Sequence, residues 1–95
     1  MDVKTRQATL KDLFDPKRGN GFAVLRVCIG ASDFNPDGSY TYCDTPDPTL
    51  AAFSIERERR ALIPLLKEIQ KVQPKLTLIA SPWSAPAWMK TSKSL

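Results

Sequence analysis

Two apolar runs, with a helical pattern between them, organise the chain. The first run, residues 22–29, is rich in β-branched residues and nearly continuous in apolar character, with Arg26 as its one charge. Such a run is typical of a parallel strand that is covered on both faces. Residues 75–80 form a shorter second run. The order of strand, helix and strand predicts a right-handed crossover between parallel neighbours.

Helical spacing marks the segment between the two runs. Its apolar positions form one stripe, which is expected to pack on a sheet. They are Leu62, Leu65, Leu66, Ile69 and Val72. Ser54 is a good N-cap, and Glu56 and Glu58 place negative charge near the positive end of the helix dipole. Pro64 would cost about 3 kcal/mol inside a helix, so we expect a kink or two abutting helices there.

A shorter helix is expected before the first strand. Thr9 is its predicted N-cap, and Asp15 followed by proline ends it. Its apolar face consists of Leu10, Leu13 and Phe14. Residues 17–21 then form a turn that leads into the strand.

The segment 30–53 follows the first strand and is rich in Gly, Ser, Asp, Asn, Pro and Thr. Residues 35–38 (Asn-Pro-Asp-Gly) are a strong turn signal, and residues 44–48 form a second rigid break. A loop of this length is uncommon in a compact domain and is usually functional.

Composition excludes several kinds of function. The chain has 95 residues and a net charge of +4, but its basic residues are scattered or interleaved with acidic ones, and no nucleic-acid module accompanies them. It contains no histidine, and its two cysteines, Cys28 and Cys43, have no metal-ligand spacing. We therefore expect no metal site. No stretch has the length of a membrane helix or the apolar core of a secretory signal, and neither result fixes the compartment.

The second strand runs into residues 81–90, a loop with two tryptophans and two prolines. Barrel enzymes place binding and catalytic residues on loops after the C-terminal ends of their strands, so a rigid aromatic loop here indicates a sugar-binding wall. A complete eight-unit barrel takes roughly 250 residues, and this chain has room for two or three units of one.

Four ordered motifs carry a family resemblance. They are residues 25–34 (LRVCIGASDF), 40–46 (YTYCDTP), 63–66 (IPLL) and 80–90 (ASPWSAPAWMK). Together they resemble glucosylceramidases, the β-glucosidases of glycoside hydrolase family 30, over roughly residues 10–95. At residue 28 the chain has cysteine where relatives commonly have proline, which bears on the local strand ending.

The resemblance implies an α/β fold: an incomplete (β/α)8 TIM barrel, with about two βα units that cover the second and third barrel strands. Residues 1–95 would be the N-terminal part of the catalytic domain, with 30–53 as its long active-site loop. The implied activity is hydrolysis of glucosylceramide or a related β-glucoside with retention, without a cofactor. The implied partners are the remainder of the barrel and, in the full enzyme, membrane lipid at a peripheral contact. The family is lysosomal in animals and often secreted in microbes.

Three residues match positions that line the glucose site of the family. Asp33 resembles an aspartate that accepts hydrogen bonds from sugar hydroxyls, although a turn aspartate that caps its own loop is the alternative. Trp83 resembles a tryptophan that contacts glucose, although plain core packing is the commoner role of this residue. Phe34 and Trp88 also match family positions and are interpreted chiefly as packing residues that hold the loops.

Arg26 is the third residue, after Asp33 and Trp83, that matches a position lining the glucose site of the family. A guanidinium within an apolar strand is costly unless it is paired, so we expect a carboxylate partner inside the barrel. In the family, an arginine here neighbours the catalytic nucleophile and helps to keep it ionised.

Retention uses a pair of carboxylates, which in this family are glutamates after the fourth and seventh barrel strands. Glu56, Glu58 and Glu68 fall on the predicted helix instead, where they are interpreted as solvated or dipole-complementing charges. The catalytic pair is therefore expected to be absent, and this chain alone to be inactive. Two alternatives are a self-contained glycan- or protein-binding module and, more weakly, a basic nucleic-acid binder.

Overall fold

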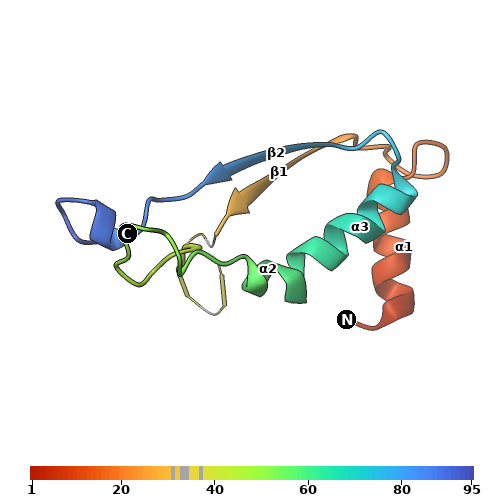
Figure 1. The fold of residues 1–95 in the computed structure, drawn as a ribbon. Coiled ribbons are helices and arrows are strands. Elements are labelled where there is room, and N and C mark those ends of the chain that lie inside the picture. The colour runs from red at the N-terminus through yellow and green to blue at the C-terminus, as the bar shows by residue number, and fades with distance from the viewer. Residues whose placement is uncertain (31, 33–34, 37) are drawn as a thin grey trace. The chain divides into compact units, whose positions relative to one another are not determined.

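A computed structural model describes residues 1–30, 32, 35–36 and 38–95. In chain order, its elements are α1 (Val3–Phe14), β1 (Val24–Ile29), α2 (Glu56–Arg60), α3 (Leu62–Val72), β2 (Thr77–Pro82) and the short 3-10 helix η1 (Ala87–Met89). The strands β1 and β2 pair in one sheet, and their arrows run the same way (Figure 1). The predicted parallel strand, helix, strand order is confirmed.

The chain divides into two compact units. The first comprises residues 1–25 and 60–79, and the second comprises residues 26–59 and 80–95. Each strand contributes its first residues to the first unit and its last residues to the second. The end of each strand thus belongs to the same unit as the loop that follows it.

The start of α1 differs from the prediction. Asp2 is the N-cap, and its Oδ1 accepts a hydrogen bond from the Thr5 amide at 2.7 Å. Thr9 lies inside the helix, where its hydroxyl donates to the Thr5 carbonyl at 2.9 Å. A threonine hydroxyl can be satisfied within a helix in this way, so a cap residue type alone does not mark a boundary. The helix ends before Asp15, as predicted.

The helical segment after the long loop is broken into α2 and α3, as Pro64 predicted. Ala61, between them, has φ −136° and ψ −56°, outside helical geometry. Pro64 is the third residue of α3, where its missing N–H would have had no intrahelical partner, so it starts a helix without cost. Ser54 acts near the predicted start: its hydroxyl accepts from the Glu56 amide at 3.2 Å.

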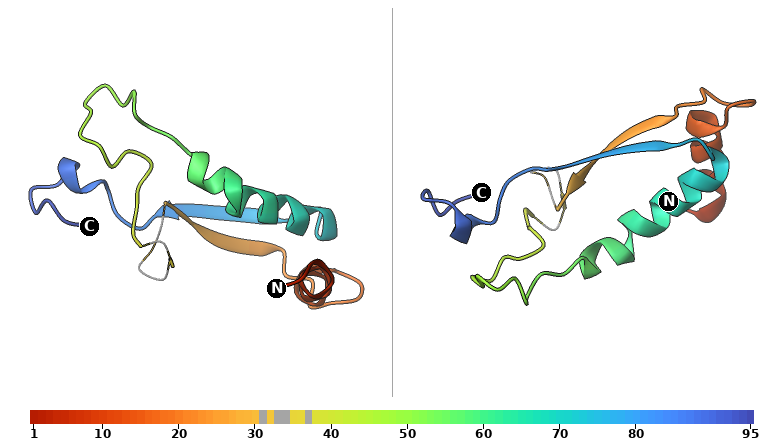
Figure 2. Two further views of the ribbon diagram at one scale, coloured as in Figure 1. Left: turned by 90° about the horizontal axis from the view of Figure 1, so that it is seen from below. Right: turned by 45° about the horizontal axis from the view of Figure 1, so that its top comes forward.

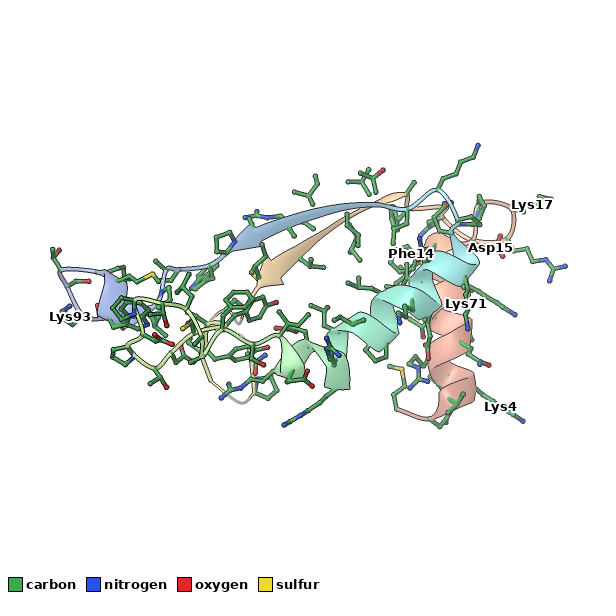
Figure 3. The ribbon with its side chains drawn as sticks, viewed as in Figure 1. Lys4, Phe14, Asp15, Lys17, Lys71 and Lys93 are labelled. Atoms are coloured by element: carbon green, nitrogen blue, oxygen red, sulfur yellow. The ribbon has the colours of Figure 1, made fainter. Side chains whose placement is uncertain are left out.

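The first unit has a small apolar core between α1 and α3. The buried side chains Leu10, Phe14 and Ile69 form it, and Leu25, Val72 and Leu76 pack against them. Figure 2 shows α1 beside the C-terminal part of α3, and Figure 3 shows Phe14 at this junction. Ile69 and Val72 of the predicted helical stripe thus meet Leu25 of β1 and Leu76, which directly precedes β2, in this core.

Two polar contacts complete this junction. Arg6 makes a bidentate ion pair with Glu68, at 3.0 Å for each nitrogen and oxygen. The buried Gln73 side chain donates to the carbonyls of Phe14 at 3.2 Å and Gly21 at 3.4 Å. A carboxamide here satisfies backbone oxygens at the end of α1 and in the following turn, which otherwise would be buried without a partner.

The prediction that the first strand is covered on both faces is wrong for this chain. Val24 is 61% exposed, while its neighbour Leu25 packs on the helical core. Successive strand residues point to opposite faces of a sheet, so the helices of the described chain cover the face of β1 that carries Leu25 and leave the face that carries Val24 open. None of these helices combines the length and apolar character needed to cross a membrane.

Candidate functional site

Trp83 stands immediately after the C-terminal end of β2 and is 54% exposed. Plain core packing therefore does not describe this side chain. It lies at the end of the strand after which barrel enzymes place their substrate-binding loops. Asp33 and Phe34 lie outside the residues that the structure describes.

Arg26 is an exposed residue of β1 in this chain. Its Nη2 donates to the hydroxyl of Ser81, in β2, at 3.4 Å. The ion pairs found among the described residues are Arg6 with Glu68 and Arg59 with Glu56, and neither involves Arg26. The carboxylate partner that we expect for Arg26 is thus not provided by the described part of this chain. Cys28, two residues further along β1, is a half-buried free thiol.

Trp88 ties the loop after β2 to the loop after β1. Its indole N–H donates to the Cys43 carbonyl at 2.7 Å. Lys93 Nζ donates to the Trp88 carbonyl at 3.1 Å, and Lys90 Nζ donates to the Ser84 hydroxyl at 2.9 Å. The interpretation of Trp88 as a residue that holds the loops is confirmed.

Cys43 is buried, at 4% exposure, and its thiol is free. The thiol donates to the Thr45 carbonyl at 3.7 Å. No group of three or more metal-ligating side chains is found in the described residues.

A buried cluster around Glu58 was missed by the sequence reasoning. The hydroxyl of Tyr40 donates to Glu58 Oε1 at 2.7 Å, and the Arg57 guanidinium lies 4.4 Å from the centre of the Tyr40 ring. Glu58 is only 6% exposed, so its interpretation as a solvated charge is wrong. The reason is a partner distant in sequence: the phenol of Tyr40, in the preceding loop, hydrogen-bonds the carboxylate, which is buried. The available signal was two tyrosines at alternate positions, 40 and 42, within a polar loop.

This environment raises the pKa of both tyrosines, Tyr40 and Tyr42. Burial, followed by the hydrogen bond to Glu58 and the charge of Glu58, raises the pKa of Tyr40 to about 12. The pKa of Tyr42 is also raised, chiefly by burial, and the Glu58 carboxylate adds to the rise while a hydrogen bond from the Gly30 backbone opposes it. Phe53 packs edge-on against the Tyr42 ring, with the ring centres 5.7 Å apart.

Gly30 allows this segment to approach the end of β1. It has φ +83°, and a Cβ at this position would lie 2.8 Å from the Tyr40 carbonyl oxygen. Both facts favour glycine, because any other residue would strain the backbone at this φ and its Cβ would clash with the Tyr40 carbonyl oxygen. The end of β1 and the backbone of Tyr40 are therefore in close contact.

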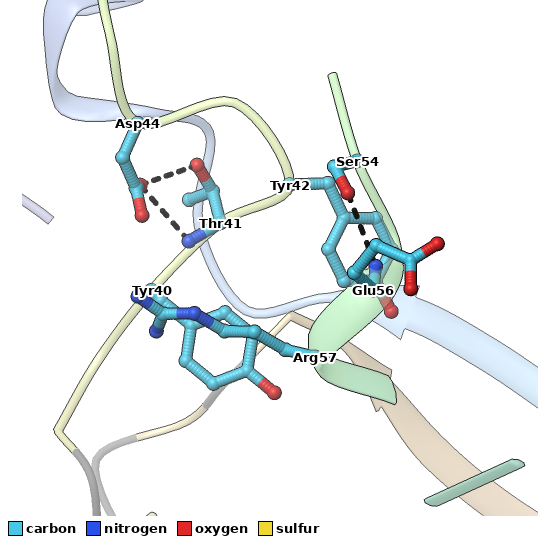
Figure 4. A pocket seen from close by; sticks show the side chains of 7 residues that line it. All are labelled: Tyr40, Thr41, Tyr42, Asp44, Ser54, Glu56 and Arg57. Carbon is cyan, nitrogen blue, oxygen red and sulfur yellow. Dashed lines mark hydrogen bonds between the residues drawn. The ribbon is translucent and has the colours of Figure 1, made fainter. Parts of the chain in front are cut away.

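A small open cleft of about 150 Å³ adjoins the cluster (Figure 4). Its lining consists of Tyr40, Thr41, Tyr42, Asp44, Ser54, Glu56 and Arg57. The polar groups largely satisfy one another: Asp44 Oδ1 accepts from the Thr41 amide at 3.0 Å and from its hydroxyl at 2.6 Å. The polar groups around the cleft are thus engaged chiefly in hydrogen bonds within the loop.

The parallel strands with an aromatic loop after them indicate part of a barrel glycosidase, and comparison with known proteins bears this out. Residues 1–95 match the glycosyl hydrolase family 30 TIM-barrel domain, and the chain belongs to this family. Members of the family are glycosidases. Membership of glycoside hydrolase family 30 and the incomplete-barrel fold are confirmed.

Two curated relatives and one solved structure illustrate the similarity. The chain is 41% identical over 93 residues to the endo-1,6-beta-D-glucanase neg1 of Aspergillus fumigatus, covering 95% of this chain and 19% of that protein. It is 35% identical over 91 residues to the lysosomal acid glucosylceramidase of Mus musculus, covering 93% of this chain and 17% of that protein. The structure of the endo-beta1,6-glucanase BT3312 superposes with a TM-score of 0.85 at 40% identity, covering 95% of this chain and 19% of that one.

The chain therefore spans about a fifth of the length of the curated relatives it matches. It corresponds to a part of the barrel domain. The narrower assignment to glucosylceramidases is not established, because endo-1,6-β-glucanases match at least as well.

Proposed function

We propose that the chain forms part of the sugar-binding wall of a retaining β-glucosidase. In this proposal the indole of Trp83 faces the sugar ring, Asp33 accepts hydrogen bonds from sugar hydroxyls, and Arg26 supports a nucleophile that lies elsewhere in the barrel. The observation that carries it is the exposed indole directly after β2. An indole offers an apolar face to the C–H side of a sugar and an N–H donor to a hydroxyl.

Arg26 has a geometry consistent with its proposed role. The neighbouring Ser81 hydroxyl lies at a long hydrogen-bonding distance, 3.4 Å, and the guanidinium remains exposed. A guanidinium has five N–H donors, and the contact with Ser81 uses one of them. A close positive charge would keep such a carboxylate ionised, as a nucleophile requires.

A β-1,6-linked glucan is the substrate that we favour. The support is the match to two proteins named as endo-1,6-β-glucanases, at 41% and 40% identity over 95% of this chain. Glucosylceramide is the second candidate, supported by the match to the mouse lysosomal acid glucosylceramidase. Both present a β-linked glucose to the wall, and they differ in the leaving group, which is a second sugar in one and a ceramide in the other. A ceramide substrate would bring the full enzyme into peripheral contact with membrane lipid.

By itself the chain is expected to be inert. Retaining hydrolysis needs two carboxyl groups about 5 to 5.5 Å apart that flank the scissile bond. The three glutamates of this chain lie on α2 and α3 rather than after a strand, and each has a different partner: Arg59 for Glu56, Tyr40 for Glu58 and Arg6 for Glu68. None of them is arranged as an acid and nucleophile pair.

A chimeric enzyme tests the proposal. The segment of a fungal endo-1,6-β-glucanase that matches this chain is replaced by residues 1–95, and hydrolysis of β-1,6-glucan and of glucosylceramide in detergent is measured. We expect β-1,6-glucan to be cleaved. Replacement of Trp83 by alanine should lower kcat/KM about tenfold or more, as expected for loss of an aromatic sugar contact.

The matched control is Met89→Ala, which removes another half-exposed apolar side chain from the same loop. It should leave kcat/KM close to that of the parent chimera. If Trp83→Ala were as active as Met89→Ala, Trp83 would not belong to the sugar wall. A chimera that cleaved only glucosylceramide would replace the favoured substrate with the second.

A further inference from the structure

The loops after β1 and β2 are joined by a chain of contacts that begins at a buried carboxylate. Glu58, on α2, accepts a hydrogen bond from the Tyr40 hydroxyl at 2.7 Å, and the Arg57 guanidinium lies over a face of the Tyr40 ring, 4.4 Å from its centre. A hydrogen bond to a buried carboxylate is stronger than one between neutral groups, and a carboxylate left without it would be costly. The residue pair therefore fixes Tyr40 against α2.

The three residues after Tyr40 are held in place by further hydrogen bonds. The Ser54 amide donates to the Tyr42 carbonyl at 2.8 Å, so the two ends of the segment 42–54 are held together. The Cys43 amide donates to the Thr41 hydroxyl at 3.3 Å. The segment 40–43 is thus fixed at several points and is not a free connection.

The last link reaches the loop after β2. The Trp88 indole donates to the Cys43 carbonyl at 2.7 Å. Trp88 is five residues from Trp83, and Lys90 Nζ, bonded to the Ser84 hydroxyl at 2.9 Å, ties the intervening turn together. Every step of this path lies within the second unit.

We propose that Glu58 is a positioning residue for sugar recognition: through Tyr40 and Trp88 it holds the loop that presents Trp83. The proposal rests on the proposed function, because it gives Trp83 a sugar to face. Glu58 touches no substrate in this scheme. Its effect is to preset a loop geometry that a bound sugar would otherwise have to organise.

Hydrogen exchange on the chain itself tests the positioning without any sugar. Glu58→Leu removes the acceptor, whereas Glu58→Gln keeps an oxygen that can accept the Tyr40 hydroxyl. Glu56→Gln, on the same helix, is the matched control because Glu56 is exposed and pairs with Arg59. Amides of α1 and α3 in the first unit are the internal reference.

We expect Glu58→Leu to speed exchange about tenfold or more in residues 40–54 and 84–90, as the loss of a buried charged hydrogen bond predicts, with α1 and α3 unchanged. Glu58→Gln and Glu56→Gln should exchange like the parent. Unchanged exchange in both loops, or an equal rise in α1 and α3, would overturn the positioning role.

Kinetics of the chimera then separate this inference from the proposed function. Glu58→Leu should raise KM for β-1,6-glucan about tenfold with a smaller change in kcat, and Glu58→Gln should restore it. If both loops loosen in the exchange experiment but KM does not change, Glu58 does hold the loops and the assignment of Trp83 to the sugar wall fails. If neither the exchange rates of the loops nor KM changes, the positioning role of Glu58 itself fails.

Discussion

Alkaline pH should destabilise this chain through Tyr40, and the size of the effect follows from its surroundings. The pKa of Tyr40 is raised from 10.0 to about 12 by burial and by Glu58. A rise of about two units corresponds to roughly 3 kcal/mol of preference for the protonated phenol in the folded state. The open cleft beside Tyr40 admits solvent, whose screening makes this value an upper limit.

The direction of the pH dependence is fixed by linkage. The folded state holds the Tyr40 proton more tightly than the unfolded state, whose phenol has its ordinary pKa. The corresponding stability is complete below about pH 10 and is lost as pH rises from about 10 to about 12. Tyr42 contributes in the same direction, since its pKa is also raised.

Urea unfolding, followed by tryptophan fluorescence at a series of pH values from about 7 to about 11.5, measures this loss. Tyr40→Phe is the comparison variant, because it keeps the ring and removes the titrating hydroxyl. We expect the free energy of unfolding of the parent to fall more steeply above about pH 10 than that of Tyr40→Phe. All other side chains are common to both chains, so their contributions cancel in the difference.

Ultraviolet absorbance gives a direct check, because phenolates absorb where phenols do not and the chain has only two tyrosines. The parent should show one tyrosine that ionises near pH 12, and Glu58→Gln should lower this value without restoring it to 10.0, because burial is the largest cause of the rise. Two tyrosines that ionise together near pH 10, or parallel urea curves for the parent and Tyr40→Phe, would refute the reasoning.

Three further substitutions test the fold by their effect on the free energy of unfolding. Gly30→Ala should cost about 2 kcal/mol or more, because its Cβ meets the Tyr40 carbonyl at 2.8 Å; Gly38→Ala, with a similar φ of +82° but open space around it, should cost only about 1 kcal/mol. Equal losses in urea unfolding would show that the contact at Gly30 is unimportant. Gln73→Ala should cost about 1 to 3 kcal/mol by leaving two carbonyls without a donor, and thermal unfolding like that of the parent would contradict it. Ile69→Ala should cost about 2 to 5 kcal/mol by opening the small core, which a calorimetric midpoint near that of the parent would disprove.

Sequence reasoning was strongest where the determining interactions are local. The helix break at Pro64 follows from the chemistry of one residue and its neighbours, and the two strands follow from short apolar runs. Trp88 was recognised as a residue that holds the loops, but its acceptor, a backbone carbonyl 45 residues away, has no signature in the sequence. Trp83 could be assigned a sugar role only through family motifs, since an exposed tryptophan and a core tryptophan look alike in a single sequence.

Two of the failures have one physical origin, which is partners distant in sequence. Glu58 looks like an ordinary solvated helix charge until Tyr40, 18 residues earlier, hydrogen-bonds it. Val24 looks like a strand residue covered on both sides, but coverage depends on a second layer that the described elements do not supply. The start of α1 was misplaced for a different, local reason: Asp2 and Thr9 are both suitable cap residues, and Asp2 is the one that caps the helix.

The unequal exposure of the two cysteines has a use in the laboratory. Cys43 is buried with its thiol turned to a carbonyl, while Cys28 is only half-buried in β1. Since alkylating reagents need an accessible thiolate, iodoacetamide should modify Cys28 first, which mass spectrometry of the peptides would verify. The native sequence thus offers a single attachment point for a spectroscopic label two residues from Arg26, without any engineered cysteine.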